Sequence, residues 1–319
     1  SNWEAFSLAS YYKLNNLIAI IDVNRLGETR ETQLGYHLDE YKKRIESFGW
    51  QSIIIDGHNA NQIINALSKA GKTNKPLCII AKTIKGKGVS FLENKEHWHG
   101  KAMDDRHLGQ ALNEIPHSNM PHVSIKKPIR SKIKKLKLGK IKSNNYKIGE
   151  EIATRDAYGN ALNSLAEDEK VLSIDAELSD STRAEKIKIH HKAQSIECFI
   201  AEQNMIGISL GLSKKGFKPF ASTFAAFLTR AHDQIRMSAL SDANFTIVGS
   251  HAGVSVGEDG ASQMGLEDIS IFRALPNSTV LYPSDAVSCE KLTKLAYRNK
   301  GITYIRTTRP KTPVIYNND

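Results

Sequence analysis

The stretch Leu17-Ile-Ala-Ile-Ile-Asp-Val-Asn-Arg-Leu-Gly27 decides the class of fold. Residues 17–23 form a nearly continuous apolar run that is rich in β-branched side chains, and a strand of this kind is buried on both faces. Such strands are typical of parallel sheets that helices cover on both sides. The run ends at the polar Asn24 and a turn, so we expect a strand over 17–23; an asparagine that merely ends a strand is the plainer interpretation.

Strand and helix patterns alternate outward from this stretch, which predicts βαβ units with parallel sheets. The first series comprises helices at 2–14, 38–48 and 60–71 and strands at 17–23, 51–55 and 77–82. The second comprises helices at 154–167, 202–214, 224–240 and 284–299 and strands at 170–175, 195–200, 217–222, 245–249, 278–282 and 302–306. The sequence therefore predicts an α/β protein with two doubly wound parallel-sheet domains, at 1–113 and 150–319.

A basic linker over 114–149 is expected between the two domains. Residues 115–149 contain nine lysines, one arginine and no acidic residue, and so they carry a charge equal to the net +10 of the whole chain. This segment also holds three prolines and several serines and asparagines, which favour a solvated linker over a folded basic patch. Phosphate-rich partners could bind such a segment without specificity. We expect no specific nucleic-acid partner.

The cysteines and the apolar runs indicate in which kind of cellular compartment the protein is located. Cys78, Cys198 and Cys289 are odd in number, widely spaced and without a metal-ligand pattern, which indicates a reducing, cytoplasmic location and no disulfide framework. No apolar run approaches the length of a membrane span, so we expect no membrane partner. The chain starts without Met and within a helical pattern, so a longer natural protein with a targeting segment stays open.

The stretch from Gly249 to Asp268 carries the strongest functional signal. It reads Gly-Ser-His-Ala-Gly-Val-Ser-Val-Gly-Glu-Asp-Gly-Ala-Ser-Gln-Met-Gly-Leu-Glu-Asp and follows a short apolar strand. It has no regular periodicity, so we expect a loop at the carboxyl end of a strand, the edge where open α/β sheets bind ligands. Glycines alone also serve plain turns. The order His251, Asp259, Gln263 is what indicates a site.

A second anchor is Ile200-Ala-Glu-Gln-Asn-Met205, where a strand ends and Glu202 opens a helix. A carboxylate in this position can be a mere partner of the helix dipole. Together with the loop, however, this stretch closely resembles the corresponding part of transketolases. The resemblance runs along the whole chain and is weak only in the linker.

The resemblance implies that thiamine diphosphate is the cofactor and that Glu202 is the catalytic glutamate. Glu202 would hydrogen-bond N1′ of the aminopyrimidine and promote formation of the thiazolium ylid, while the protein supplies orientation and proton traffic. Phe224 and Phe227 resemble the aromatic wall that stacks on the aminopyrimidine, although a pair at helical spacing is often simply core.

Further ligands follow from the same resemblance. Asn24, through its side-chain oxygen, and Leu26, through its carbonyl, would bind Mg²⁺ or Ca²⁺, since these cations prefer oxygen ligands. Lys85 and His99 resemble the basic pair around the cofactor diphosphate and the substrate. The implied catalytic residues are Glu202, His99 and His251.

The implied substrates are sugar phosphates. Arginine forks suit phosphate better than lysine does, and Arg155, Ser181 and Arg309 resemble the phosphate ligands. His99, His251 and Gln263 would bind the sugar, and Asp259 would recognise the configuration of one hydroxyl. Arg155 and Lys85, taken singly, equally fit solvated surface charges.

The resemblance implies transfer of a two-carbon ketol unit from a ketose phosphate to an aldose phosphate, in the pentose phosphate pathway, by a homodimer with active sites at its interface. One alternative is a 1-deoxyxylulose-5-phosphate synthase-type enzyme, which lacks the His-x-Gly-Val-Ser-x-Gly-Glu-Asp-Gly loop. The other is a non-catalytic transketolase-like subunit. The Gly-Asp-Gly metal segment and the C-terminal domain of the family are not in this sequence, so we expect a fragment that is inactive alone.

Overall fold

The computed structural model describes residues 2–115, 124 and 135–318. These residues fall into an amino-terminal unit within 2–131 and a carboxy-terminal unit within 132–319. Within the described ranges, every helix is too short or too polar to cross a membrane. All three cysteines are buried free thiols.

The amino-terminal unit is built on a three-stranded parallel sheet in the order β1-β3-β2. Its elements are α1 (Asn2–Tyr11), β1 (Ile18–Val23), α2 (Leu38–Ser47), β2 (Gln51–Asp56), α3 (Ala60–Leu67), β3 (Leu77–Lys82) and α4 (Asp105–Glu114). Side chains of the central strand β3 alternate between the two faces. Cys78 and Ile80 pack with residues of α1 and α2, whereas Leu77 and Ile79 pack with residues of α3. Burial on both faces explains the continuous apolar run of β3. The same expectation for 17–23 is wrong, because β1 is an edge strand in which Ile20 is 63% exposed.

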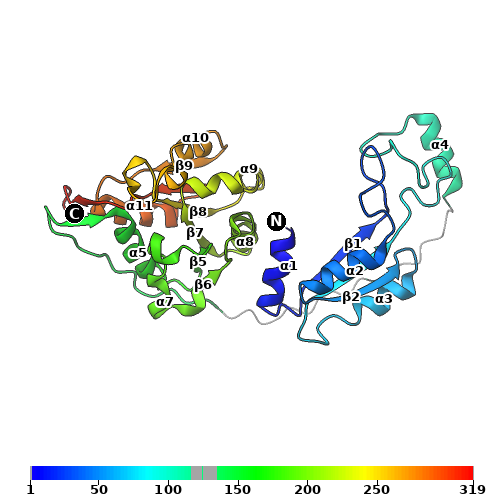
Figure 1. Cartoon of the computed structure of the whole chain (residues 1–319), viewed down its shortest axis with the longest axis horizontal. Coiled ribbons are helices and arrows are strands. Elements are labelled where there is room, and N and C mark those ends of the chain that lie inside the picture. Colours follow the sequence, from blue (N-terminus) through cyan, green and yellow to red (C-terminus); the bar gives the residue numbers. More distant parts are fainter. Residues whose placement is uncertain (1, 116–123, 125–134, 319) are drawn as a thin grey trace. The chain divides into compact units, whose positions relative to one another are not determined.

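The carboxy-terminal unit is built on a six-stranded parallel sheet in the order β6-β5-β7-β8-β10-β9. Its elements are β4 (Glu151–Ala153), α5 (Thr154–Leu165), β5 (Val171–Asp175), α6 (Ser179–Thr182), α7 (Lys186–His190), η1 (Lys192–Gln194), β6 (Ser195–Glu197), α8 (Glu202–Lys214), β7 (Lys218–Phe224), η2 (Ala226–Ala231), α9 (His232–Leu240), β8 (Phe245–Ser250), η3 (Val254–Val256), η4 (Ala261–Gln263), α10 (Asp268–Arg273), β9 (Ser278–Leu281), α11 (Ala286–Arg298), β10 (Ile302–Arg306) and β11 (Lys311–Pro313). Figure 1 shows this sheet between α5 and α11 on one side and α8 and α9 on the other. Tyr158 and Phe220 are fully buried in the core between the sheet and α5 and α11.

Both predicted parallel α/β sheets are confirmed, and the differences lie at their carboxyl edges. The helix expected over 224–240 is divided, because β7 continues to Phe224, which pairs with Ser250 of β8, and the 3-10 helix η2 precedes α9. The strand expected over 195–200 ends at Glu197. The Glu197 carboxylate accepts hydrogen bonds from the backbone N–H groups of Glu177 and Phe199, which turns the chain away from the sheet.

The described end of the predicted linker, residues 135–149, lies against the carboxy-terminal unit. The Glu169 N–H donates to the Lys137 carbonyl at 2.9 Å, and the Gly139 N–H donates to the Glu167 carbonyl at 2.7 Å. Tyr146 is buried in the core of this unit. This part of the segment is therefore docked and not solvated throughout, because Tyr146 supplies an apolar anchor that a charge count overlooks. The rest of the expected linker, at 116–123 and 125–134, lies outside the described residues.

Asp175, the last residue of β5, is a carboxylic acid enclosed in the core. Its side chain is fully buried, Oδ1 accepts a hydrogen bond from the Leu178 N–H at 2.8 Å, and Oδ2 has no partner among the described residues. Burial raises the pKa of Asp175 to about 7, and the charge of Glu197 on the neighbouring strand β6 adds to the rise. The fold therefore favours the neutral acid.

We expect Asp175→Asn to remove a pH-dependent loss of stability. Because the folded-state pKa of about 7 lies above the ordinary value of 3.8, the stabilising contribution is complete below pH 3.8 and is lost as the pH rises to about 7. The amide stays neutral, so the stability of the variant relative to the parent protein should rise between pH 5 and pH 8 by at most about 2.7 kcal/mol, because about two pH units separate pH 5 from the folded-state pKa. Urea midpoints at both pH values measure this difference, with the exposed Asp242→Asn as the charge-matched control. An equal change in both variants would contradict the assignment.

Candidate active site

Glu202 begins helix α8 at the carboxyl edge of the six-stranded sheet. Its side chain is only 4% exposed, and Oε2 makes no hydrogen bond within the described part of the chain. The Nη1 atom of Arg230 lies 3.4 Å from this oxygen. A buried carboxylate oxygen without a hydrogen-bond donor is costly, typically by about 1–3 kcal/mol or more. This oxygen is suited to accept a hydrogen bond from a ligand.

Glu202 lines a pocket of about 660 Å³ whose wall is largely apolar. Ile200, Phe227 and Met264 contribute side chains to that wall. The lining also includes polar side chains, namely Thr229, Arg230, Ser262 and Glu267. Small-molecule sites typically combine an apolar wall with a few such polar groups. The pocket thus offers the apolar surface and the hydrogen-bond acceptor that an aminopyrimidine ring would need.

Three rings stack beside this pocket. Phe224 stacks on Phe227 with centroids 5.2 Å apart and also on His251 with centroids 3.9 Å apart. Phe227 lines the pocket, whereas Phe224 is not among its lining residues and is itself buried. The predicted aromatic pair thus exists, with one ring at the pocket and the other in contact with both that ring and His251.

His251 and Arg155 form a polar cluster with Ser181. Arg155 Nη1 donates to the Ser181 carbonyl at 3.0 Å and lies 3.3 Å from His251 Nε2, while His251 Nδ1 lies 3.0 Å from Ser250 Oγ. Burial and the neighbouring charge of Arg155 lower the pKa of His251 to about 4. His251 is therefore neutral near pH 7, with Nε2 accepting from Arg155 and Nδ1–H facing Ser250.

Arg309 joins the loop to the end of β10. Its guanidinium donates to the Glu258 carboxylate at 2.6 Å and to the Val256 carbonyl at 3.1 Å, and Nη1 lies 3.2 Å from Asp259 Oδ1. The charge of Arg309 also acts on Arg155 and His251. The folded chain thus brings together five of the residues that the resemblance implies as substrate ligands: Arg155, Ser181, His251, Asp259 and Arg309.

Gln263 is the exception in this unit. Its side-chain oxygen accepts from the neighbouring Ser262 hydroxyl, and no contact with the Arg155 cluster is seen in the described structure. Its place in substrate binding stays a prediction.

A buried ion pair holds the loop in place. Arg306 Nε donates to Asp268 Oδ2 at 2.9 Å, the Tyr304 hydroxyl donates to the same oxygen at 2.6 Å, and Arg306 Nη2 donates to the Gly265 carbonyl at 3.0 Å. Gly265 must lack a side chain, since a Cβ atom there would lie 2.5 Å from that of Ala225. The loop between His251 and Asp268 is therefore fixed at its far end against β10 and β7.

The predicted residues of the amino-terminal unit follow β1 and β3. Lys85 Nζ lies 3.3 Å from His99 Nδ1, so the predicted basic pair is in contact. Asn24 Oδ1 accepts from the Leu26 N–H at 3.0 Å, and its amide donates to Asp22 at 3.2 Å. The same Asp22 carboxylate accepts from the Thr83 hydroxyl beyond β3.

The metal prediction rests on few donors in this chain. Within the described residues, no cluster of three or more His, Cys, Asp or Glu side chains could hold an ion. Asn24 and Leu26 together offer two oxygen ligands, and Ca²⁺ or Mg²⁺ takes about six or more. Most ligands would have to come from a diphosphate, water or other residues.

Two functional candidates were not found from the sequence. Arg230 contacts Glu202, and Arg183 adds its charge to the field at Arg155 and His251. Arg183 pairs with Asp156 at 2.9 Å. Neither arginine lies in a motif, and only the folded chain shows that they adjoin the site.

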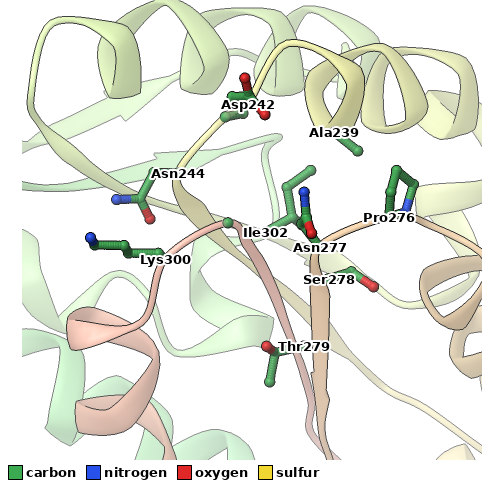
Figure 2. Close-up of a pocket in the computed structure, with 11 residues that line it drawn as sticks. Ala239, Asp242, Asn244, Pro276, Asn277, Ser278, Thr279, Lys300 and Ile302 are labelled. Atoms are coloured by element: carbon green, nitrogen blue, oxygen red, sulfur yellow. The ribbon is translucent and has the colours of Figure 1, made fainter.

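A different pocket of about 580 Å³ lies at the amino ends of β8, β9 and β10 (Figure 2). In Figure 2 the side chains of Asp242 and Lys300 extend from separate loops at its rim. None of the predicted site residues lines it. Ligands of parallel α/β sheets bind at the opposite edge, so the pocket at Glu202 is the better candidate for an active site.

Comparison with known proteins accounts for this arrangement. The chain matches the thiamine diphosphate binding domain of transketolase over residues 1–166 and the transketolase pyrimidine binding domain over residues 150–314. These matches define a two-domain, thiamine diphosphate-binding type of protein. The chain belongs to the transketolase family.

Relatives agree with this assignment. Human transketolase is 45% identical over 335 residues, which cover 100% of this chain and 52% of the human protein. Mouse transketolase-like protein 2 is 48% identical, over 99% of this chain and 52% of its own length. The chain thus spans about half the length of the curated relatives it matches. The crystal structure of transketolase from Campylobacter jejuni is similar in fold, with a TM-score of 0.79 and 26% identity over 99% of this chain and 55% of that one.

We expect the His251 ring to titrate at about pH 4, far below an exposed histidine. Arg155→Gln should raise this midpoint only in part, because burial is the larger cause and remains. NMR signals of the ring protons, assigned with His251→Gln, give the midpoint, and Arg298→Gln at the exposed end of α11 is the charge-matched control. A midpoint unchanged by Arg155→Gln would show that Arg155 does not act on this ring.

Proposed function

We propose that this chain is part of a transketolase that transfers a two-carbon ketol unit from a ketose phosphate to an aldose phosphate. The observation that supports this most directly is the buried Oε2 of Glu202, which has an ion-pair partner in Arg230 but no hydrogen bond within the described residues and lies at a mainly apolar pocket. A cytoplasmic location and a role in the pentose phosphate pathway belong to the same proposal.

Thiamine diphosphate, when bound, would supply the carbanion chemistry that cleaves and forms the bond next to a carbonyl. Glu202 would accept a hydrogen bond from the aminopyrimidine and hold its proton. Phe227, supported by Phe224, would pack on that ring. Asn24 and Leu26 would share Mg²⁺ or Ca²⁺ with the diphosphate, and Lys85 would neutralise its charge.

The cluster around Arg155, His251 and Arg309 would bind the phosphate of the sugar. Arg155 and Arg309 would donate to its oxygens, with Ser181 beside them. Neutral His251 can serve as a hydrogen-bonding partner for a sugar hydroxyl without adding a charge. Asp259, held by Arg309, would recognise a second hydroxyl, while His99 and Gln263 complete the proposed set.

A non-catalytic transketolase-like subunit is the main alternative. Transketolase-like protein 2 of mouse is as similar to this chain as transketolases are, so identity does not separate the two. Calorimetric titration of the complete protein with thiamine diphosphate and Mg²⁺, followed by a ketol-transfer assay, does. Absence of both binding and transfer would favour the subunit. The 1-deoxyxylulose-5-phosphate synthase alternative has no structural observation in its favour.

Glu202→Gln in the complete protein should slow hydrogen–deuterium exchange at C2 of bound thiamine diphosphate by about a hundredfold or more. The amide preserves size but cannot take up the proton that Glu202 is proposed to hold. NMR of the quenched cofactor measures the exchange.

Glu267→Gln is the matched control, because Glu267 is an exposed carboxylate that lines the same pocket. It should exchange at the parental rate. Parental exchange in Glu202→Gln itself would remove Glu202 from this role.

We further propose a homodimer whose active sites combine the first domain of one chain with the second domain of its partner. The proposed diphosphate residues lie in one unit and the pyrimidine residues in the other, and a two-fold interface would build each site twice.

Complementation tests this arrangement. Complete chains carrying Asn24→Ala or Glu202→Ala should each be nearly inactive as homodimers. A mixed dimer should recover about half of the parental activity, because one of its two sites is intact. Purified heterodimers without activity would place both ligand sets in the same chain.

A further inference from the structure

The docked end of the basic segment forms a further, smaller cavity with α5 and α7. Its volume is about 190 Å³, and its lining residues are Lys140, Lys142, Asn163, Ser164, Glu167, His190 and His191. Glu167 precedes β5 and His191 precedes β6, so this cavity lies toward the amino ends of these strands. The proposed active site is at their carboxyl ends.

Backbone contacts place the two lysines here. The Gly139 N–H donates to the Glu167 carbonyl at 2.7 Å, and a Cβ atom on Gly139 would lie 2.5 Å from Glu167 Oε2. A side chain at this position would displace the Glu167 carboxylate and crowd its Cβ atom and carbonyl oxygen, each 3.2 Å away. Two residues earlier, the Lys137 N–H donates to the Glu169 carboxylate at 2.9 Å, which holds the backbone at that point. These contacts hold residues 137–139 against Glu167 and Glu169, which follow α5, and the chain continues from there to Lys140 and Lys142 at the cavity.

The charges around the cavity favour an anion. Two lysines and two histidines line it together with one carboxylate, and that carboxylate lies 3.8 Å from His191 Nε2. The Asn163 Oδ1 atom is buried and has no hydrogen-bond partner among the residues described. A suitable ligand would accept hydrogen bonds from lysine and histidine and donate one to Asn163.

We propose that this cavity binds one phosphate group, as inorganic phosphate or a small phosphate monoester. The phosphate oxygens accept from Lys140, Lys142 and a histidine, and a P–OH group or a hydroxyl of the monoester donates to Asn163. The volume suits one phosphate with a short substituent and not an extended polyanion. The site gives the docked part of the basic segment a function that does not depend on ketol transfer.

NMR titration of the 319-residue chain with inorganic phosphate tests the proposal, at constant ionic strength maintained with sodium chloride. Ring signals of His190 and His191, assigned with His190→Gln and His191→Gln, should shift and saturate at millimolar phosphate. The double variant Lys140→Gln/Lys142→Gln should weaken this binding about tenfold. The ring signals of His251 report separately on phosphate that binds beside Arg155.

The matched control is Lys135→Gln/Lys137→Gln, which removes the same charge from the same segment outside the cavity. It should leave the affinity unchanged. An equal loss of phosphate affinity in both double variants would mean that phosphate is attracted to the basic segment without a defined site. Ring signals of His190 and His191 that do not shift would overturn the proposal. Glycerol 1-phosphate distinguishes the ligands: tighter binding than phosphate identifies a monoester, and equal binding identifies phosphate alone. Both lysine side chains are exposed, and circular dichroism verifies that the variants fold.

Discussion

Every strand of the six-stranded sheet runs in the same direction, and this constraint assembles the candidate site. The carboxyl ends of parallel strands share one edge, where backbone groups and loop side chains remain open to a ligand. The chain leaves β6 towards Glu202, leaves β7 at Phe224 and leaves β8 at His251. Residues that are far apart in the sequence thereby meet at one pocket and one charged cluster.

Three positive charges lie close together around His251, and they repel one another: Arg155, Arg183 and Arg309. Burial lowers the pKa of Arg155, and the positive charges of Arg183 and Arg309 lower it further. His251 stays neutral beside them, which avoids a fourth positive charge. A phosphate would offset this repulsion and accept the arginine forks at the same time. Carboxylates already offset part of this repulsion, since Arg183 pairs with Asp156 and Arg309 pairs with Glu258 and Asp259.

The loop that contributes His251 and Asp259 owes its shape to burial more than to its own sequence. Asp268 and Arg306 form a fully enclosed pair with Tyr304, and breaking such a pair typically costs about 3–5 kcal/mol. The Gly253 N–H also donates to the Gly265 carbonyl at 2.8 Å, which closes the loop on itself. These contacts hold a glycine-rich segment that has little regular structure of its own.

The sequence by itself determined the alternating strands and helices, because apolar runs such as 17–23 and 77–82 are typical of strands in parallel sheets. Only the structure decided that 77–82 is the central, doubly covered strand β3 and that 17–23 is the edge strand β1. The sequence also indicated Glu202, Arg155 and His251 through their motifs. It could not reveal Arg230 beside Glu202 or the docking of residues 135–149, since neither has a local signature. Tertiary structure alone decided these, and with them the neutral state of His251, because burial and the charge of a neighbour 96 residues away exist only after the sheet has formed.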